Sequence, residues 1–143
     1  MSEEKSFYMR KDENIVKKIL FFESKDGGIG IVFDDDKENK VEGSKLVGEV
    51  VYTLKNPDWR LKNHIRSGAS ISNMIGGSST DPYIFNNLIV EYLLKDWSLD
   101  HKFELEKNIN GFEVIKDVND LIGSDIEDFI FDAVVLIYNR FIA

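Results

Sequence analysis

The sequence predicts a single α+β domain, in which a small N-terminal antiparallel sheet of about three strands precedes a mostly helical bundle. Two observations predict this class. β-branched and aromatic residues gather in strand-like segments within residues 15–54, and helical periodicity governs residues 55–143. The 143 residues fit one domain, with residues 1–14 as a flexible arm. We expect the bundle to form around one central apolar helix.

Two strands are predicted over Ile15–Glu23 and Ile29–Phe33, which are rich in β-branched and aromatic residues. The Asp26-Gly27 pair between them supplies the positive-φ geometry that a hairpin turn needs. A third strand is predicted over Lys45–Leu54, after a charged connection. A helix over the first segment is the alternative that the pattern leaves open.

The helical region begins near Pro57, which is tolerated at the first position of a helix. Apolar and polar residues then recur with helical spacing as far as Arg66, which predicts a short helix. A loop rich in glycine and serine follows over residues 67–80. Its Gly76–Gly77 pair predicts a hinge just before the central helix.

The central helix is predicted over residues 82–99. Asp81 can cap its first turn, and Pro82 loses no hydrogen bond at the first helical position. Apolar side chains cover most of the helical circumference, and the narrow polar stripe contains Glu91 and Lys95. Such a helix needs neighbours on several sides, so we expect it in the core.

The last third of the chain is predicted to contain a connection over residues 101–111, a short helix or mixed segment over residues 112–122, and a C-terminal helix over residues 124–142. Ser124 and Glu127 have the spacing of a capping box, in which the side chain of each residue accepts a hydrogen bond from the backbone N–H of the other. This pair predicts where the last helix begins.

The composition is that of a globular protein with an acidic balance. Hydrophobic residues make up 43% of the chain and charged residues 31%, so a packed core is expected. The formal net charge of -8 argues against a nucleic-acid partner, because phosphate binding relies on clustered lysine and arginine. The absence of cysteine excludes disulfides and cysteine-ligated metals.

No segment of the sequence predicts membrane insertion or export. The N-terminus is charged and contains no apolar run of the signal-peptide kind. The longest uninterrupted apolar run, Ala133–Tyr138, is far too short to cross a bilayer. We therefore expect a cytoplasmic protein that binds no membrane.

The sequence predicts neither an active site nor a bound cofactor or metal. His101 with Glu104 is the nearest approach to a helical metal pair and is a weak one, and a surface position is the better interpretation for both His64 and His101. The acidic run Asp34–Asp36 lacks the glycine and the bidentate acid that a calcium loop requires. A GxSxG nucleophile elbow and a phosphate-binding loop are both absent. We expect a protein that is not an enzyme.

The order of motifs resembles one known family. A Pro-x-Trp helix start follows a strand in VVYTLKNPDWR, an apolar helix closes in LLKDWSLD, and a connection containing NINGFEVIKDVNDLI leads to the last helix, SDIEDFIFDAVVLIYNRF. This succession, over residues 45–141, resembles the tail assembly chaperones of long-tailed bacteriophages.

The resemblance implies a small, mostly helical, non-enzymatic protein that binds the tape-measure protein and assists assembly of the tail tube. It implies protein partners, the tape-measure or tail tube protein, in the cytoplasm of a bacterial host. The N-terminal β-region departs from the mostly helical family pattern. The alternative is therefore a structural component of a phage virion or of a phage tail-like particle.

A client-binding surface would need exposed apolar residues bordered by charge. On the predicted C-terminal helix, two apolar residues fall on the polar side, and further apolar groups stand near the chain end. Two interpretations stay open for them: a partner or homo-oligomer surface, and simple cover by neighbouring elements. The candidate partner-binding residues are Trp59, Val135, Leu136, Phe141 and Ile142.

Overall fold

The computed structural model describes residues 14–39, 43–72 and 78–143, which form an α+β fold. The predicted N-terminal arm and the Gly76–Gly77 hinge lie outside the described residues, although Asn14 is the first residue of a strand. In chain order the elements are β1 (Asn14–Glu23), β2 (Ile29–Phe33), the 3₁₀ helix η2 (Asp34–Asn39), β3 (Lys45–Lys55), α1 (Trp59–Gly68), β4 (Ser70–Ser72), β5 (Ser78–Thr80), α2 (Pro82–Leu93), β6 (Leu94–Trp97), β7 (Leu105–Lys107), β8 (Glu113–Ile115), α3 (Val118–Ile122) and α4 (Asp128–Phe141).

The main sheet has four antiparallel strands in the order β2-β1-β3-β6. Its fourth strand comes from the middle of the chain, after α2, so the prediction of a sheet confined to residues 15–54 is wrong. The physical reason is that a strand edge carries backbone N–H and C=O groups that need partners. β6 supplies such partners to β3, with Tyr52 opposite Trp97 and Leu54 opposite Leu94.

β1 and β2 form the hairpin that the Asp-Gly pair predicts, which excludes the helical alternative for the first segment. The backbone N–H of Ser24 donates to the carbonyl of Gly28 over 2.9 Å, and that of Gly27 donates back to Ser24 over 3.0 Å. Gly27 has a φ of +89°, a conformation that glycine adopts without a steric penalty. The turn therefore depends on glycine at this position.

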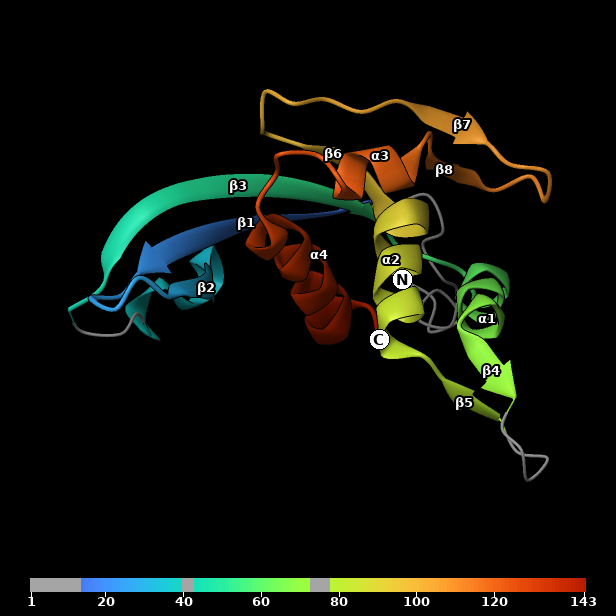
Figure 1. The fold of residues 1–143 in the computed structure, drawn as a ribbon, viewed down its shortest axis with the longest axis horizontal. Coiled ribbons are helices and arrows are strands. Elements are labelled where there is room, and N and C mark those ends of the chain that lie inside the picture. The colour runs from blue at the N-terminus through green and yellow to red at the C-terminus, as the bar shows by residue number, and fades with distance from the viewer. Residues whose placement is uncertain (1–13, 40–42, 73–77) are drawn as a thin grey trace, which may run out of the picture.

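β3 passes through two environments along its length. From Val50 onward its residues alternate between buried and half-buried, and Val50, Tyr52 and Leu54 belong to the core. Residues 45–49 are all exposed. We call the exposed end of the sheet, residues 22–30 and 45–49, the sheet arm. Figure 1 shows β1, β2 and β3 continuing past α4 as this arm.

A register shift lies at the boundary of the sheet arm. Phe21 pairs with Gly48, whereas Phe22 pairs with Leu46, so Val47 has no partner of its own in the ladder between β1 and β3. An extra residue of this kind bends a strand and increases its twist. The shift accounts for the curvature of β3 in Figure 1.

α2 begins at the predicted position but ends before the predicted one. The Asp81 carboxylate caps the helix, because its Oδ1 accepts hydrogen bonds from the N–H groups of Tyr83 (2.9 Å) and Ile84 (3.3 Å). The chain becomes extended at Leu94, with φ -70° and ψ 123°, and continues directly as β6. The prediction of one helix over residues 82–99 is therefore wrong in its last third.

The burial of Trp97 explains why the helix stops. In β6 this side chain is only 2% exposed, and its Nε1 donates to the carbonyl of His101 over 2.7 Å. Its ring lies 5.2 Å from that of Phe103 and 5.8 Å from that of Phe131. These contacts and the pairing with β3 outweigh the helical propensity of the segment.

The predicted C-terminal helix over residues 124–142 is wrong at its start. The short helix α3 ends just before Ser124, and α4 begins at Asp128. The hydroxyl of Ser124 donates to the carbonyl of Leu121 at the end of α3 over 2.6 Å. Glu127 occupies the N-cap position of α4 and makes no side-chain capping bond. The serine serves the helix before it, so the capping-box interpretation fails.

The helices do not form the predicted bundle over residues 55–143. α2 contacts both α1 and α4, which lie on either side of it in Figure 1. α4 packs on the sheet, with the ring of Phe129 5.1 Å from that of Phe21. Two further hairpins, β4–β5 and β7–β8, lie in the region predicted to be helical. A sheet face offers α4 an apolar surface, so α4 packs on the sheet as well as on α2.

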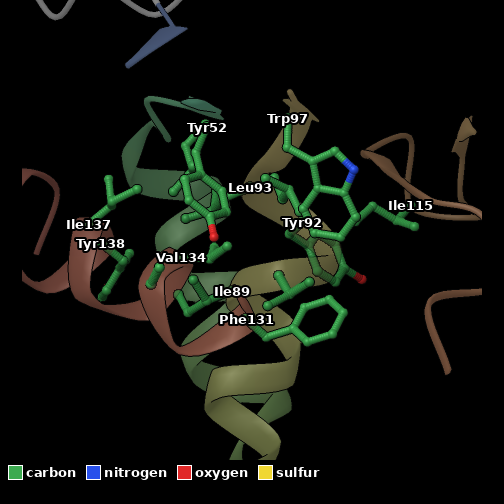
Figure 2. Packing of buried hydrophobic residues seen from close by; sticks show 14 of the residues in the cluster. Tyr52, Ile89, Tyr92, Leu93, Trp97, Ile115, Phe131, Val134, Ile137 and Tyr138 are labelled. Carbon is green, nitrogen blue, oxygen red and sulfur yellow. The ribbon is translucent and has the colours of Figure 1, made fainter. Parts of the chain in front are cut away.

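The core lies between the inner face of the sheet and the helices α2 and α4. Figure 2 shows Tyr52 between Leu93 and Ile137, with its hydroxyl turned toward α4. This hydroxyl donates to the carbonyl of Ile130 over 2.7 Å, and burial raises the pKa of the Tyr52 phenol far above its usual value. A buried phenol that has a hydrogen-bond partner stays neutral, so Tyr52 links the sheet to the first turn of α4.

Candidate protein-interaction surface

The five partner-binding candidates occupy different environments in the structure. Trp59 is 79% exposed at the first residue of α1, and Leu136 is 39% exposed on α4. Val135 and Phe141 are half-buried, and Ile142 is buried. Of the five candidates, Trp59 and Leu136 are therefore the exposed ones, and they lie on different helices.

Phe141 contributes to packing between α4 and the sheet. Its ring meets that of Phe33 edge-on at 5.5 Å, and the Lys17 ammonium lies 4.1 Å from its centroid. The neighbouring Arg140 stacks on Phe33 and pairs with Asp36 of η2. A hydrogen bond from Arg140 lowers the pKa of the Asp36 carboxyl below its usual value of 3.8. These contacts hold η2 against the end of α4.

Two highly exposed apolar side chains, Trp59 and Ile109, come from elements that touch. Ile109, in the turn between β7 and β8, is 100% exposed. The next residue, Asn110, accepts a hydrogen bond from Arg60 over 3.4 Å, and the Arg60 guanidinium stacks 4.8 Å above the ring of Phe112. Trp59 directly precedes Arg60 on α1. We call Trp59, Arg60, Ile109 and Phe112 the α1–hairpin surface.

The turn that presents Ile109 has a defined geometry. The Asn108 side-chain oxygen accepts from the N–H groups of Asn110 (3.0 Å) and Phe112 (3.1 Å), and the Asn108 backbone pairs with Phe112 over 2.9 Å. Gly111 completes the turn with a φ of +83°. An isoleucine is thus held in solvent by a turn that is fully bonded within itself.

A polar network connects this turn to the helices. The Asn108 amide donates to the Tyr92 hydroxyl over 3.0 Å, and that hydroxyl also bonds Nε2 of His64 at 3.1 Å. The His64 ring lies 4.8 Å from that of Phe112. Burial and the nearby Glu91 carboxylate raise the pKa of the Tyr92 phenol, and the bond from Asn108 opposes them. His64, predicted to lie at the surface, therefore joins α1 and α2 to the hairpin.

An open recess of about 310 Å³ lies between α1 and the hairpin turn. Its walls combine one guanidinium, one imidazole, one hydroxyl and two amide side chains with an aromatic ring. They are Arg60, Asn63, His64, Ser67, Asn110 and Phe112.

Sequence reasoning overlooked Ile109 and Arg60 as surface candidates. The sequence of residues 108–111 does indicate a tight turn, because an Asn-x-Asn-Gly order is typical of one. The second residue of such a turn points into solvent, and isoleucine is unusual there. This order predicts exposure of Ile109, but no sequence pattern places it beside α1.

A second apolar surface lies on the outer face of the sheet. Val16, Leu46 and Val47 are each about half-exposed there. Beside them, an open groove of about 320 Å³ runs along the sheet arm, with Phe22 and Val32 in its lining. Phe22 is itself buried, although it lies outside the main core cluster. The sheet arm thus presents apolar surface away from the helices.

Another recess, of about 410 Å³, lies between the β6–β7 connection and α3. It contains charges of both signs, and Lys116 lies 3.9 Å from Glu104 within it. In the described part of the chain, no three histidine or acidic side chains converge as metal ligands would. No described helix is long and apolar enough to cross a membrane.

Comparisons with known proteins do not assign a function to this chain. A scan against protein-family models, a search of curated proteins and a search of solved structures each gave no match to this chain.

Proposed function

We propose that this protein is a non-enzymatic tail assembly chaperone of a long-tailed bacteriophage, which binds the tape-measure protein and assists assembly of the tail tube. The order of its sequence motifs supports the family, and the α1–hairpin surface supports the binding activity. The single observation that carries the proposal is the exposure of Trp59 and Ile109 on two elements that are joined through Arg60.

Tryptophan and arginine are enriched among the residues that dominate binding energy at protein interfaces. Trp59 and Arg60 are neighbours on α1, and the hairpin turn holds Ile109 in place without needing to rearrange. A pre-ordered surface loses little conformational entropy when a partner binds. Such a surface can bind the apolar face of an amphipathic helix. A tape-measure protein would expose helices of this kind before the tail tube surrounds it.

The α+β fold adds one feature that favours the alternative function. β2 is an edge strand of the main sheet, and its five residues, Ile29–Phe33, carry no charge. Charged residues and proline are common protection against edge-to-edge pairing, and β2 has neither. A structural component of a virion or tail-like particle could use such an edge to extend a neighbour's sheet.

Co-expression with the tape-measure protein of the same phage tests the proposal. The chaperone should raise the soluble fraction of the tape-measure protein and co-purify with it from the host cytoplasm. Trp59→Ala combined with Ile109→Ser should abolish both effects, whereas Val16→Ser on the sheet should leave them intact. Absence of any effect by the wild-type protein would refute the chaperone function.

Analysis of purified mature particles separates the two functions. A chaperone acts before the tail is complete, so mass spectrometry of the particles should find at most trace amounts of this chain. Stoichiometric presence in every particle would instead establish the structural role. A β2 variant such as Val32→Lys should then reduce incorporation, because the lysine places a charge on the edge strand at a position that lines the open groove.

A further inference from the structure

Helix α1 differs in charge from the rest of the protein. It contains Arg60, Lys62 and Arg66 and no acidic residue, whereas the whole chain has a formal net charge of -8. The preceding Asp58 is occupied as the N-cap, because its carboxylate accepts from the N–H of Leu61 over 2.9 Å. Helix α1 is therefore a basic element of an acidic protein, and the α1–hairpin surface takes its positive charge from Arg60.

Arg60 is the cation that lies at the recess. Among the described residues it forms no ion pair, and its contacts are the 3.4 Å bond to the Asn110 carbonyl and the stacking on Phe112. A guanidinium has five N–H donors in a planar fork, so these contacts leave donors for a further acceptor. The ring of Phe112 fixes the plane of the fork and excludes water from one of its faces.

The other recess residues also suit an acidic group. Asn63, His64 and Ser67 lie at helical spacing after Arg60, so they line one side of α1 and carry side chains that can donate hydrogen bonds. A carboxylate accepts such bonds, and a bond between charged partners is stronger than one between neutral groups.

We propose that the α1–hairpin surface binds an acidic amphipathic segment of a partner protein. A glutamate or aspartate of the segment enters the recess and pairs with Arg60, and apolar side chains of the same segment lie on Trp59 and Ile109. This proposal rests on the proposed function and specifies the chemistry of the partner at that site. It predicts that binding requires both the acidic and the apolar face of the segment.

A protein segment fits this surface better than a nucleic acid does. Single-stranded nucleic acids need aromatic platforms for successive bases and a basic track for the phosphates. Here the turn that bonds Arg60 presents the aliphatic Ile109 instead of a further aromatic platform, and Arg60 is the one lysine or arginine among the residues that line the recess. An aliphatic group beside a single accessible arginine matches a short segment with alternating apolar and acidic residues.

The binding test uses the full chain and a fluorescein-labelled helical peptide of about 18 residues, or five turns, with leucine on one face and glutamate beside it. Fluorescence anisotropy should show saturable binding of this peptide. A matched peptide with glutamine in place of glutamate should bind about tenfold more weakly, the scale of one charge-assisted hydrogen bond. A single-stranded oligonucleotide of similar length should show no saturable binding.

Matched variants locate the binding site. Arg60→Gln should weaken the acidic peptide about tenfold and remove its advantage over the glutamine peptide. Arg66→Gln makes the same change of charge on the same helix; Arg66 does not line the recess and reaches it only through a 3.2 Å hydrogen bond to Asn63, so the loss should be much smaller. Ile109→Ser should weaken both peptides equally, whereas Val16→Ser, an equivalent change on the sheet, should not. Thermal melting followed by circular dichroism checks that each variant is folded.

Three outcomes would overturn the proposal. Equal losses for Arg60→Gln and Arg66→Gln would mean unspecific charge attraction, tighter binding of the oligonucleotide would mean a nucleic-acid site, and equal binding of both peptides would remove the role of the carboxylate. The tape-measure co-expression experiment is a separate readout. Client binding that survives Arg60→Gln refutes this inference alone, and a wild-type protein that binds the acidic peptide but no tape-measure protein refutes the proposed function alone.

Discussion

The two halves of β3 belong to one strand but depend on different interactions. Every second residue from Val50 to Leu54 is buried in the core, and residues 52–54 pair with β6 on their second edge, whereas residues 45–49 in the sheet arm are exposed. Both halves are paired with β1. The comparison teaches that backbone pairing can extend a sheet well beyond the core that stabilises it. Core substitutions should therefore be costly, and those in the sheet arm should have local effects.

The largest effect is expected at Trp97, which lies opposite Tyr52 of the buried half of β3. Trp97→Ala removes a buried ring and should lower the free energy of unfolding by about 3–5 kcal/mol, measured by urea denaturation. Trp59→Ala is the matched control, because that ring is exposed and its loss should change stability by less than about 0.5 kcal/mol. Similar losses in the two variants would mean that Trp59 is covered in solution.

An intermediate effect is expected at the turn of the sheet arm. Gly27→Ala places a side chain at a φ of +89° and should cost about 1–2 kcal/mol in urea denaturation. No atom lies within 4 Å of the added Cβ, so the cost comes from the backbone conformation. Gly48→Ala also meets open space but without a positive φ, and it should be neutral or stabilising. A greater loss for Gly48→Ala would contradict this account.

A smaller, pH-dependent effect is expected where η2 meets α4. Arg140 lowers the pKa of Asp36 below 3.8, so this carboxyl releases its proton more readily in the folded state than in the unfolded state. Its stabilising contribution is present above pH 3.8 and is lost as the pH falls through the lowered pKa. NMR titration of Asp36 should give a value below 3.8 that rises toward it in Arg140→Gln.

The stability of Asp36→Asn completes that test. The difference between the wild type and this variant should shrink as the pH falls below 3.8, and high salt should reduce it at neutral pH because the pair is exposed. A difference that grows on acidification would have the wrong sign and would exclude the ion pair as its cause.

The smallest effect is expected on the outer face of the sheet arm. Leu46 is 49% exposed, and Leu46→Ser should change the free energy of unfolding by less than about 0.5 kcal/mol in urea denaturation. Ile19→Ser, on the inner face of β1, is the contrasting buried substitution and should cost several-fold more. A loss above about 2 kcal/mol for Leu46→Ser would show that another copy or segment covers the arm in solution.

Features set by neighbouring residues could be predicted from the sequence. The Asp26-Gly27 turn and the Asp81 cap each depend on local backbone geometry, and both occur at the predicted positions. The α+β class is likewise correct, although its division into an N-terminal sheet and a helical bundle is wrong. Local chemistry is visible in a sequence because the interacting atoms are only a few residues apart.

Features set by distant residues could not be predicted. The hydrophobic pattern of the segment after Leu93 fits a helix as well as a strand. It forms a strand because it pairs with β3. Ser124 lies between two helices, so its side chain could cap the helix that follows or bond the helix that precedes it. Its hydroxyl donates to the carbonyl of Leu121, in the preceding helix. The α1–hairpin surface depends on the contact between Arg60 and Asn110, which no periodicity encodes.

The pairing of β6 with β3 has a consequence for the order of folding. It closes a loop that contains α1, β4, β5 and α2, whereas the β1–β2 hairpin closes only its own five-residue turn. Longer loops lose more chain entropy on closure, so we expect the hairpin to form early and the β3–β6 edge to form late. Pulse-labelling hydrogen exchange should show early protection in β1 and β2 and late protection at Val51 and Ser98, whose N–H groups bond across the β3–β6 edge. The β1–β2 hairpin would then be the nucleus to which the β3–β6 edge is added.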